Sequence, residues 1–185
     1  MNAQETRFSP LARLLHWSMA VMILAMLFVG IGMVSTASER YRYLLAVHRP
    51  LGILILVLAV VRLTHRLLNP APPLPASLPK AQHAAAKISH ILLYALMFIM
   101  PLLGWAMLSA APYPIPLVGG LRLPAILSPD AELYARLRAL HTDFALVFYA
   151  VILMHLGAAL FHVWIRRDGV FQSMAGRRKL PHRAR

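Results

Sequence analysis

The stretch LHTDFALVFYAVILMHLG, residues 140–157, places a histidine near each end of a largely apolar run. Apart from Thr142 and Asp143, the residues between His141 and His155 are apolar or aromatic. A helix needs about 20 mostly apolar residues to cross the hydrocarbon core of a membrane. An ionisable ring in lipid is costly, and it marks a functional site by default when it has a partner. The stretch therefore predicts a membrane-spanning helix that carries a histidine near each surface.

The composition extends this interpretation to the whole chain. Of the 185 residues, 59% are hydrophobic and only 14% are charged, which is too apolar for an ordinary soluble domain. Lipid offers no hydrogen-bond partner to an open strand edge, so the spans should be helices. We predict an all-α membrane protein, a single domain over residues 1–185 built as a four-helix bundle. The predicted spans are residues 14–35, 46–68, 88–110 and 140–165, followed by a basic tail over 166–185.

The distribution of basic residues predicts the orientation. Thirteen lysines and arginines fall in the N-terminal segment, the second connection and the tail, against six on the other side. The cytoplasmic side of a membrane protein carries the excess, so both termini should be cytoplasmic. The net charge of +13 does not indicate a nucleic-acid partner, because the basic residues sit at span ends and no nucleic-acid-binding motif is present. The external connection over 111–130 is proline-rich, and we expect it to be irregular.

The chain contains no cysteine, which restricts the chemistry of any metal centre. Structural disulfides, thiolate metal sites, iron–sulfur clusters and covalently attached c-type haem are all excluded. Histidine is then the side chain to examine.

A 14-residue interval relates the histidines to other special residues. His141 and His155 share one helix face and lie about 21 Å apart along its axis. The same interval separates His48 from Arg62, His16 from Gly30, and His90 from Gly104. Each span thus presents a polar or small residue at two levels, as a bundle needs if a bulky flat group lies between its helices.

Two levels of inward-facing histidines suit two stacked haems, because neutral imidazole is a good iron ligand. At the external level only His48 and His141 are available. At the cytoplasmic level the spacing leaves the choice open among His16, His90 and His155. The plainer alternative is that these histidines lie at the membrane interface, where water or backbone groups satisfy their nitrogens. A zinc site is a second alternative, but three or four closely spaced ligands are not evident in the sequence.

The motifs LARLLHW, HRPLGILILVLAVVRL, ISHILLY, MPLLGW and LHTDFALVFYAVILMH resemble, in order and over nearly the whole chain, the bacterial cytochrome b561 family. These are di-haem proteins of the bacterial inner membrane, and the resemblance is greatest to the superoxide oxidase branch. It implies two non-covalent b haems. His16 and His155 would bind the inner haem iron, and His48 and His141 the outer one.

Other polar residues receive roles from their level in the bundle. Arg62 should lie near the inner haem, where it could pair with a propionate or with quinone, or extend toward the interface as an arginine at a span end does. Arg13, Lys87 and His90 lie at the same level and form a candidate quinone-side cluster. Arg49 follows a ligand and could neutralise an outer-haem propionate. His162, two turns further out, could belong to the quinone-side cluster too, and His65, His83 and His182 read as surface residues.

The resemblance implies an oxidoreductase that moves electrons from external superoxide, oxidised to O2, to ubiquinone in the membrane, with no partner protein required. The alternative is a haem-b anchor subunit that links a periplasmic dehydrogenase or hydrogenase to the quinone pool. A transporter is disfavoured because no span is broken mid-membrane. Superoxide is an anion, and external arginines could steer it to the outer haem rather than pair only with lipid phosphates. The candidates for steering are Arg49, Arg136 and Arg138.

Overall fold

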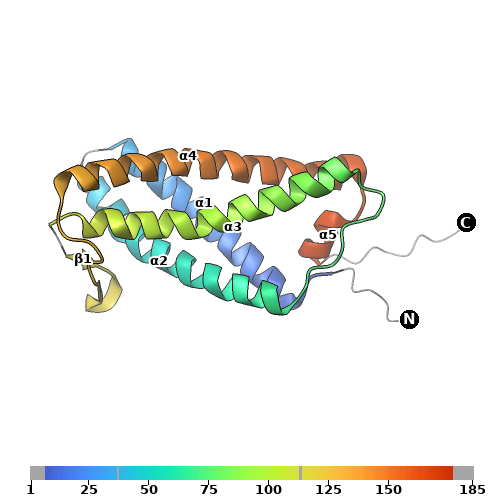
Figure 1. Cartoon of the computed structure of the whole chain (residues 1–185), viewed down its shortest axis with the longest axis horizontal. Helices are drawn as coiled ribbons and strands as arrows, with labels where there is room; N and C mark the ends of the chain where they lie inside the picture. Colours follow the sequence, from blue (N-terminus) through green and yellow to red (C-terminus); the bar gives the residue numbers. More distant parts are fainter. Residues whose placement is uncertain (1–6, 37, 113, 177–185) are drawn as a thin grey trace, which may run out of the picture.

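The computed structural model describes residues 7–36, 38–112 and 114–176, and four long helices dominate it. They are α1 (Pro10–Val34), α2 (Glu39–Leu68), α3 (Lys80–Ser109) and α4 (Ala131–Phe161). A single π-helical turn, η2 (His162–Arg166), continues α4, and the short helix α5 (Val170–Ala175) follows it. Consecutive long helices run in opposite directions, so the start of α1 and α5 lie at the same end of the bundle (Figure 1). We call this the inner end and the opposite one the outer end.

The surface of the bundle is apolar along its sides. All four long helices can cross a membrane by length and composition, and the most apolar 18-residue stretch of each has a mean hydropathy of 2.2 to 2.4. Only 6 to 11% of the residues in these stretches are buried inside the protein. Apolar side chains that face outward on every helix are what a lipid environment requires. The prediction of an all-helical, four-span membrane bundle is confirmed.

All four helices begin earlier than the predicted spans, α1 at Pro10 rather than near 14 and the other three by seven to nine residues. The helix α2 starts at Glu39 rather than near 46, α3 at Lys80 rather than near 88, and α4 at Ala131 rather than near 140. These first turns are polar, so a hydropathy window does not detect them. Side-chain caps stabilise two of them, since Ser38 Oγ accepts from the Arg40 amide at 3.3 Å and Asp130 Oδ1 from the Leu133 amide at 2.9 Å.

The connection over residues 111–130, predicted to be external, is more regular than expected, which corrects the prediction of an irregular loop. Strands β1 (Ile115–Pro116) and β2 (Arg122–Leu123) pair antiparallel around the short helical turn η1 (Val118–Gly120). Gly119 and Gly120 have φ of 66° and 79°, which only glycine adopts readily, and so they permit the tight reversal. Trp105 Nε1 donates to the Pro124 carbonyl at 2.9 Å and attaches the loop to α3.

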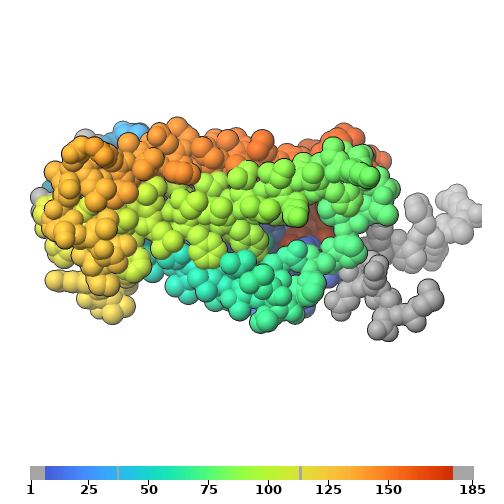
Figure 2. Space-filling model, viewed as in Figure 1, coloured from blue at the N-terminus to red at the C-terminus, as the bar shows by residue number. Residues whose placement is uncertain are grey.

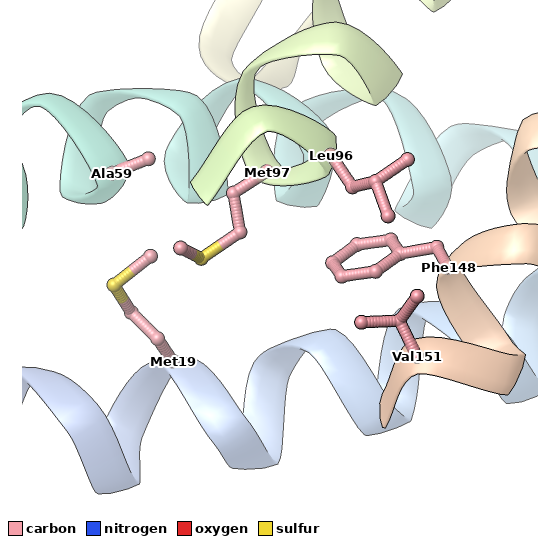
Figure 3. Packing of buried hydrophobic residues seen from close by; sticks show 6 residues of the cluster. All are labelled: Met19, Ala59, Leu96, Met97, Phe148 and Val151. Atoms are coloured by element: carbon pink, nitrogen blue, oxygen red, sulfur yellow. The ribbon is translucent and has the colours of Figure 1, made fainter. Parts of the chain in front are cut away.

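The buried core lies between the two histidine levels. It contains side chains from all four long helices, which meet at the centre of the bundle (Figure 3). Phe148 follows His141 by seven residues and precedes His155 by seven, so it lies about 10 Å along the axis from each. An apolar layer therefore separates the two levels. Its buried members are Met19, Ala59, Leu96, Met97, Phe148 and Val151.

Candidate cofactor-binding site

The outer histidine level contains one pair of facing rings. His48 on α2 and His141 on α4 are both partly buried, with ring centres 6.1 Å apart and planes at 63°. The Nδ1 atom of each ring is buried and has no hydrogen-bond partner among the described residues. An unsatisfied buried nitrogen costs free energy, so these rings are suited to a further ligand.

Glycines on α1 and α3 leave room at the outer level. A Cβ atom added at Gly104 would lie 3.3 Å from His141 Cε1, closer than ordinary van der Waals contact. The ring of His141 can therefore pack where it does because position 104 has no side chain. A Cβ atom added at Gly30 would meet no described atom within 4 Å. That the two glycines accommodate a bulky group stays a prediction: Gly104 accommodates the His141 ring, and the space next to Gly30 is open.

The inner level brings three histidines together. The ring of His155 on α4 lies 6.3 Å from that of His16 on α1 and 5.7 Å from that of His90 on α3, centre to centre. The interplanar angles are 75° and 63°. Geometry alone leaves the partner of His155 open between His16 and His90, as the sequence spacing does.

The ring pairs fit a haem iron bound by two imidazoles. A metal–nitrogen bond of about 2 Å on each side, added to the distance from each nitrogen to its ring centre, gives about 6 Å between ring centres. The measured 6.1 and 6.3 Å agree with this value. In addition, Arg49 Nε and Arg62 Nη1 are buried and lack a partner among the described residues. Buried guanidinium nitrogens suit carboxylates such as haem propionates.

A cavity of about 430 Å³ opens at the inner end. Its walls come from the end of α2 and the connection that follows it (residues 69–73), from α3, from α1 and the segment before it, and from α5. Figure 2 shows this face hollowed between α2 and α3. Arg62 and His90 line it, as does Tyr94, whose hydroxyl accepts a hydrogen bond from Arg62 Nε at 3.2 Å. Tyr94 was not among the predicted site residues, although it follows His90 by four residues and so shares its helix face.

Two members of the candidate quinone-side cluster lie elsewhere. The Arg13 guanidinium packs against the backbone of Gly176, where an added Cβ atom would lie 3.1 Å from Arg13 Cζ. Lys87 is exposed and does not line the cavity. His65, which was expected at the surface without a role, is instead partly buried and lines the cavity.

The three arginines considered for steering have different surroundings. Arg49 is partly buried next to the outer histidine pair. Arg138 is exposed in a shallow depression that Tyr134 and Asp143 also line. Arg136 forms an exposed ion pair with Glu132 one turn earlier on α4. Its charge is therefore partly compensated, unlike that of Arg49.

The C-terminal segment folds back onto the inner end. Asp168 Oδ2 lies 2.7 Å from His162 Nδ1 and 3.5 Å from Arg166 Nε, and Asp168 Oδ1 accepts from the Val170 amide at 3.2 Å. Burial raises the pKa of Asp168, but the hydrogen bonds from His162 and Val170 outweigh it and hold that pKa below its ordinary value. Trp17 Nε1 donates to the Met174 carbonyl at 3.3 Å and connects α1 to this segment. The rest of the predicted basic tail, residues 177–185, lies outside the described residues.

Comparisons with known proteins agree with this arrangement. The family model for the prokaryotic cytochrome b561 matches residues 7–177. Cytochrome b561 homolog 1 of Escherichia coli (strain K12) is 32% identical, over 94% of this chain and 99% of its own length. Cytochrome b561 homolog 2 of the same organism is 29% identical over 92% of each chain. The probable superoxide oxidase CybB of Yersinia pestis is 26% identical over 89% of this chain and 93% of its own. This chain belongs to the prokaryotic cytochrome b561 family, a family of membrane electron-transfer proteins that bind haem b.

Proposed function

We propose that this chain is a single-domain, two-haem oxidoreductase that oxidises superoxide outside the membrane and reduces ubiquinone at the inner end. The observation that carries the proposal is the pair of histidine levels, with ring centres 6.1 Å apart at one level and 6.3 Å at the other. An apolar layer separates them, so each level can hold its own haem. The inner end, where the quinone cavity opens, is the cytoplasmic one by the distribution of basic residues.

The protein's own residues would hold the haems in a defined way. His48 and His141 would bind the outer iron, and His155 the inner iron together with His16, the partner that the family resemblance favours. Arg49 and Arg62 would each offer a buried guanidinium nitrogen to a propionate. When bound, the haems supply one-electron redox chemistry. The chain fixes their ligands and keeps water out of the layer between them.

The overall reaction balances as two superoxide anions, one quinone and two protons giving two O2 molecules and one quinol. The name of the Yersinia pestis relative, a probable superoxide oxidase, supports superoxide as the donor. The inner cavity supports a quinone as the acceptor, since 430 Å³ is within the usual range for a small-molecule site. Arg62 and Tyr94 are positioned there to donate hydrogen bonds to a quinone carbonyl.

The test is to purify the chain in detergent without any partner and to follow haem absorbance in a stopped-flow instrument. Enzymatically generated superoxide should reduce the haems, and a short-chain ubiquinone added afterwards should reoxidise them. Superoxide dismutase in the first step is the control, because it removes the donor and should abolish reduction. Haems that stay oxidised under superoxide would contradict the proposal.

The second candidate function is a haem-b anchor for a separate external enzyme. The tip of the external hairpin favours it, because Val118 and Leu121 are each 68% exposed at the outer end and could contact a partner protein. This function predicts no reduction by superoxide alone. Co-purification of a dehydrogenase with the native protein, lost on Val118→Asp and Leu121→Asp substitution, would support the anchor.

A further inference from the structure

His65 occupies a position in the inner cavity that the proposed function does not use. It lies on α2 one turn after Arg62, nearer the end of the helix and the aqueous phase. Its ring nitrogen Nε2 lies 3.3 Å from Ser9 Oγ, within hydrogen-bond range. Ser9 is itself fixed, because it caps α1 and accepts a hydrogen bond from the Ala12 amide at 3.2 Å. The orientation of the His65 imidazole is thus fixed by Ser9, a residue 56 positions earlier in the chain.

The charged side chains around this cavity are basic. Arg62 and Arg66 face it from α2, and Arg7 from the segment before α1, while α3 contributes His90 and Tyr94. No carboxylate lines the cavity among the described residues. Guanidinium groups stabilise the negative charge that develops on a quinone oxygen during reduction, but arginine does not give up its proton. A second type of side chain must therefore supply the protons that quinol formation consumes.

Imidazole is the side chain best suited to exchange protons near neutral pH. Of the two histidines in the cavity, His90 packs its ring against His155 at the inner histidine level, 5.7 Å away centre to centre. His65 lies toward the aqueous side and contacts a hydroxyl that can orient it. The position of His65 is the better one for taking a proton from water and passing it inward.

We propose that His65 is the proton donor to the quinone, with Ser9 as its positioning residue. This inference rests on the proposed function. Two molecules of the external donor each lose one electron, and the quinone gains both. The N–H bond of the His65 imidazolium breaks as an O–H bond forms on a carbonyl oxygen, and His65 then takes a proton from the aqueous phase. A second cycle supplies the second proton, so one quinone, two electrons and two protons give one quinol.

The central test is His65→Gln, which keeps a hydrogen-bonding side chain beside Ser9 but cannot carry a proton at neutral pH. We expect kcat for quinone reduction to fall about 100-fold or more, the usual range for loss of a general acid. KM and the equilibrium affinity for a short-chain ubiquinone should change less than about 2-fold, and added imidazole should restore part of the rate. Reduction of the haems by the external donor should be unchanged. His83→Gln is the matched control, because His83 lies on α3 at the same end but does not line the cavity.

Ser9 provides the test of positioning. Ser9→Ala should lower kcat by several-fold without loss of quinone affinity, while Ser9→Thr, which keeps the hydroxyl, should retain the wild-type rate. An unchanged kcat in His65→Gln, or a parallel loss of quinone affinity, would overturn the assignment of His65. Failure of quinone to reoxidise the wild-type haems would instead refute the proposed function itself, so the two failures are distinguishable.

Discussion

The imidazole rings of His48 and His141 face each other from α2 and α4, with centres 6.1 Å apart. That distance and the 63° between the ring planes are those of an edge-to-face pair, and they also match two imidazoles bound to one metal ion between them. The Nδ1 atom of each ring is buried and has no hydrogen-bond partner among the described residues, so a further ligand would satisfy it. The relationship predicts a cofactor at the outer level, and it can be tested by removing either ring.

The first prediction is that each chain binds two non-covalent b haems, and that His48→Ala or His141→Ala leaves one. Each ring would supply one of the two protein ligands of its iron, so loss of one ring should release the outer haem. A pyridine haemochrome assay against protein concentration measures the ratio. His83→Ala should keep two haems per chain, because His83 takes no part in the ring pairs. A ratio of one or none in the wild type would refute the two-level interpretation.

The second prediction concerns the inner iron, for which His16 and His90 compete as partners of His155. We expect His16→Ala to remove the inner haem and His90→Ala to retain it. The family resemblance pairs His16 with His155, and the ring distances, 6.3 Å to His16 and 5.7 Å to His90, do not choose between them. Haem content and low-temperature absorbance spectra distinguish the two variants. The reverse result would assign the inner iron to His90 and His155.

The third prediction is that Gly104→Ala disturbs the outer site. The added methyl group would lie 3.3 Å from the ring of His141, so the ring must shift by a few tenths of an ångström. We expect a change in the spectrum or a loss of the outer haem, while the inner haem stays bound. Gly157→Ala is the matched control on α4, since nothing described lies within 4 Å of a Cβ atom there. Equal effects of both substitutions would mean that Gly104 has no special role.

The fourth prediction concerns Asp168, which connects η2 to α5. Its side chain is only 9% exposed and interacts with His162 and Arg166. Asp168→Asn should weaken the attachment of α5 by about 1.5–3 kcal/mol, the usual cost of losing a hydrogen bond to a charged group. Hydrogen exchange of amides 170–176 should rise at least about 10-fold, as a difference of this size implies. Exchange over α2 serves as the internal control.

The pH dependence of this contact follows from the lowered pKa of Asp168. A carboxyl group with a lowered folded-state pKa contributes stability that is present above its ordinary pKa, about 4, and lost as pH falls through the lowered value. Protection of α5 should therefore fall on acidification in the wild type and respond less in Asp168→Asn. A wild-type protection that does not change on acidification would contradict this role.

The fold was predictable because hydropathy is a property of each segment by itself. The polar first turns of α2 and α4 were missed since their stability depends on the caps Ser38 and Asp130 rather than on apolar length. The external hairpin was missed because its prolines argued against regular structure, while the positive φ of Gly119 and Gly120 permits it.

The candidate site was predictable in part. Helical spacing alone brought His48 and His141 to one level, but it could not choose between His16 and His90, and neither can the ring distances. The position of His65 depends on its contact with Ser9, which precedes α1. The two residues are 56 positions apart, so no local sequence pattern predicts this contact. The compensation of Arg136 by Glu132 is different, since the two are four residues apart on one helix and the pair could have been anticipated.

The last prediction is that external arginines steer superoxide toward the outer histidine pair. Positive potential focused near a site can raise the association rate of an anion by roughly 10- to 1000-fold. Arg49 directly follows His48, and Arg138 lies one turn before His141 on the outer side, so both are near the level where the anion reacts. Arg49→Gln and Arg138→Glu should each lower the rate of haem reduction by superoxide several-fold, measured by stopped flow at equal haem content.

The double substitution Glu39→Gln and Arg42→Gln is the matched control for this prediction, because it removes an exposed outer-end ion pair of 3.1 Å without changing the net charge. Removing the other outer-end pair, by Glu132→Gln with Arg136→Gln, should likewise leave the rate nearly unchanged, because the net charge stays the same. Salt should slow the wild-type reaction, since the Debye length shrinks from about 30 Å at 0.01 M to about 8 Å at 0.15 M. The salt dependence should be shallower in Arg138→Glu. A wild-type rate that is independent of ionic strength would exclude steering and would favour an external partner protein as the electron donor.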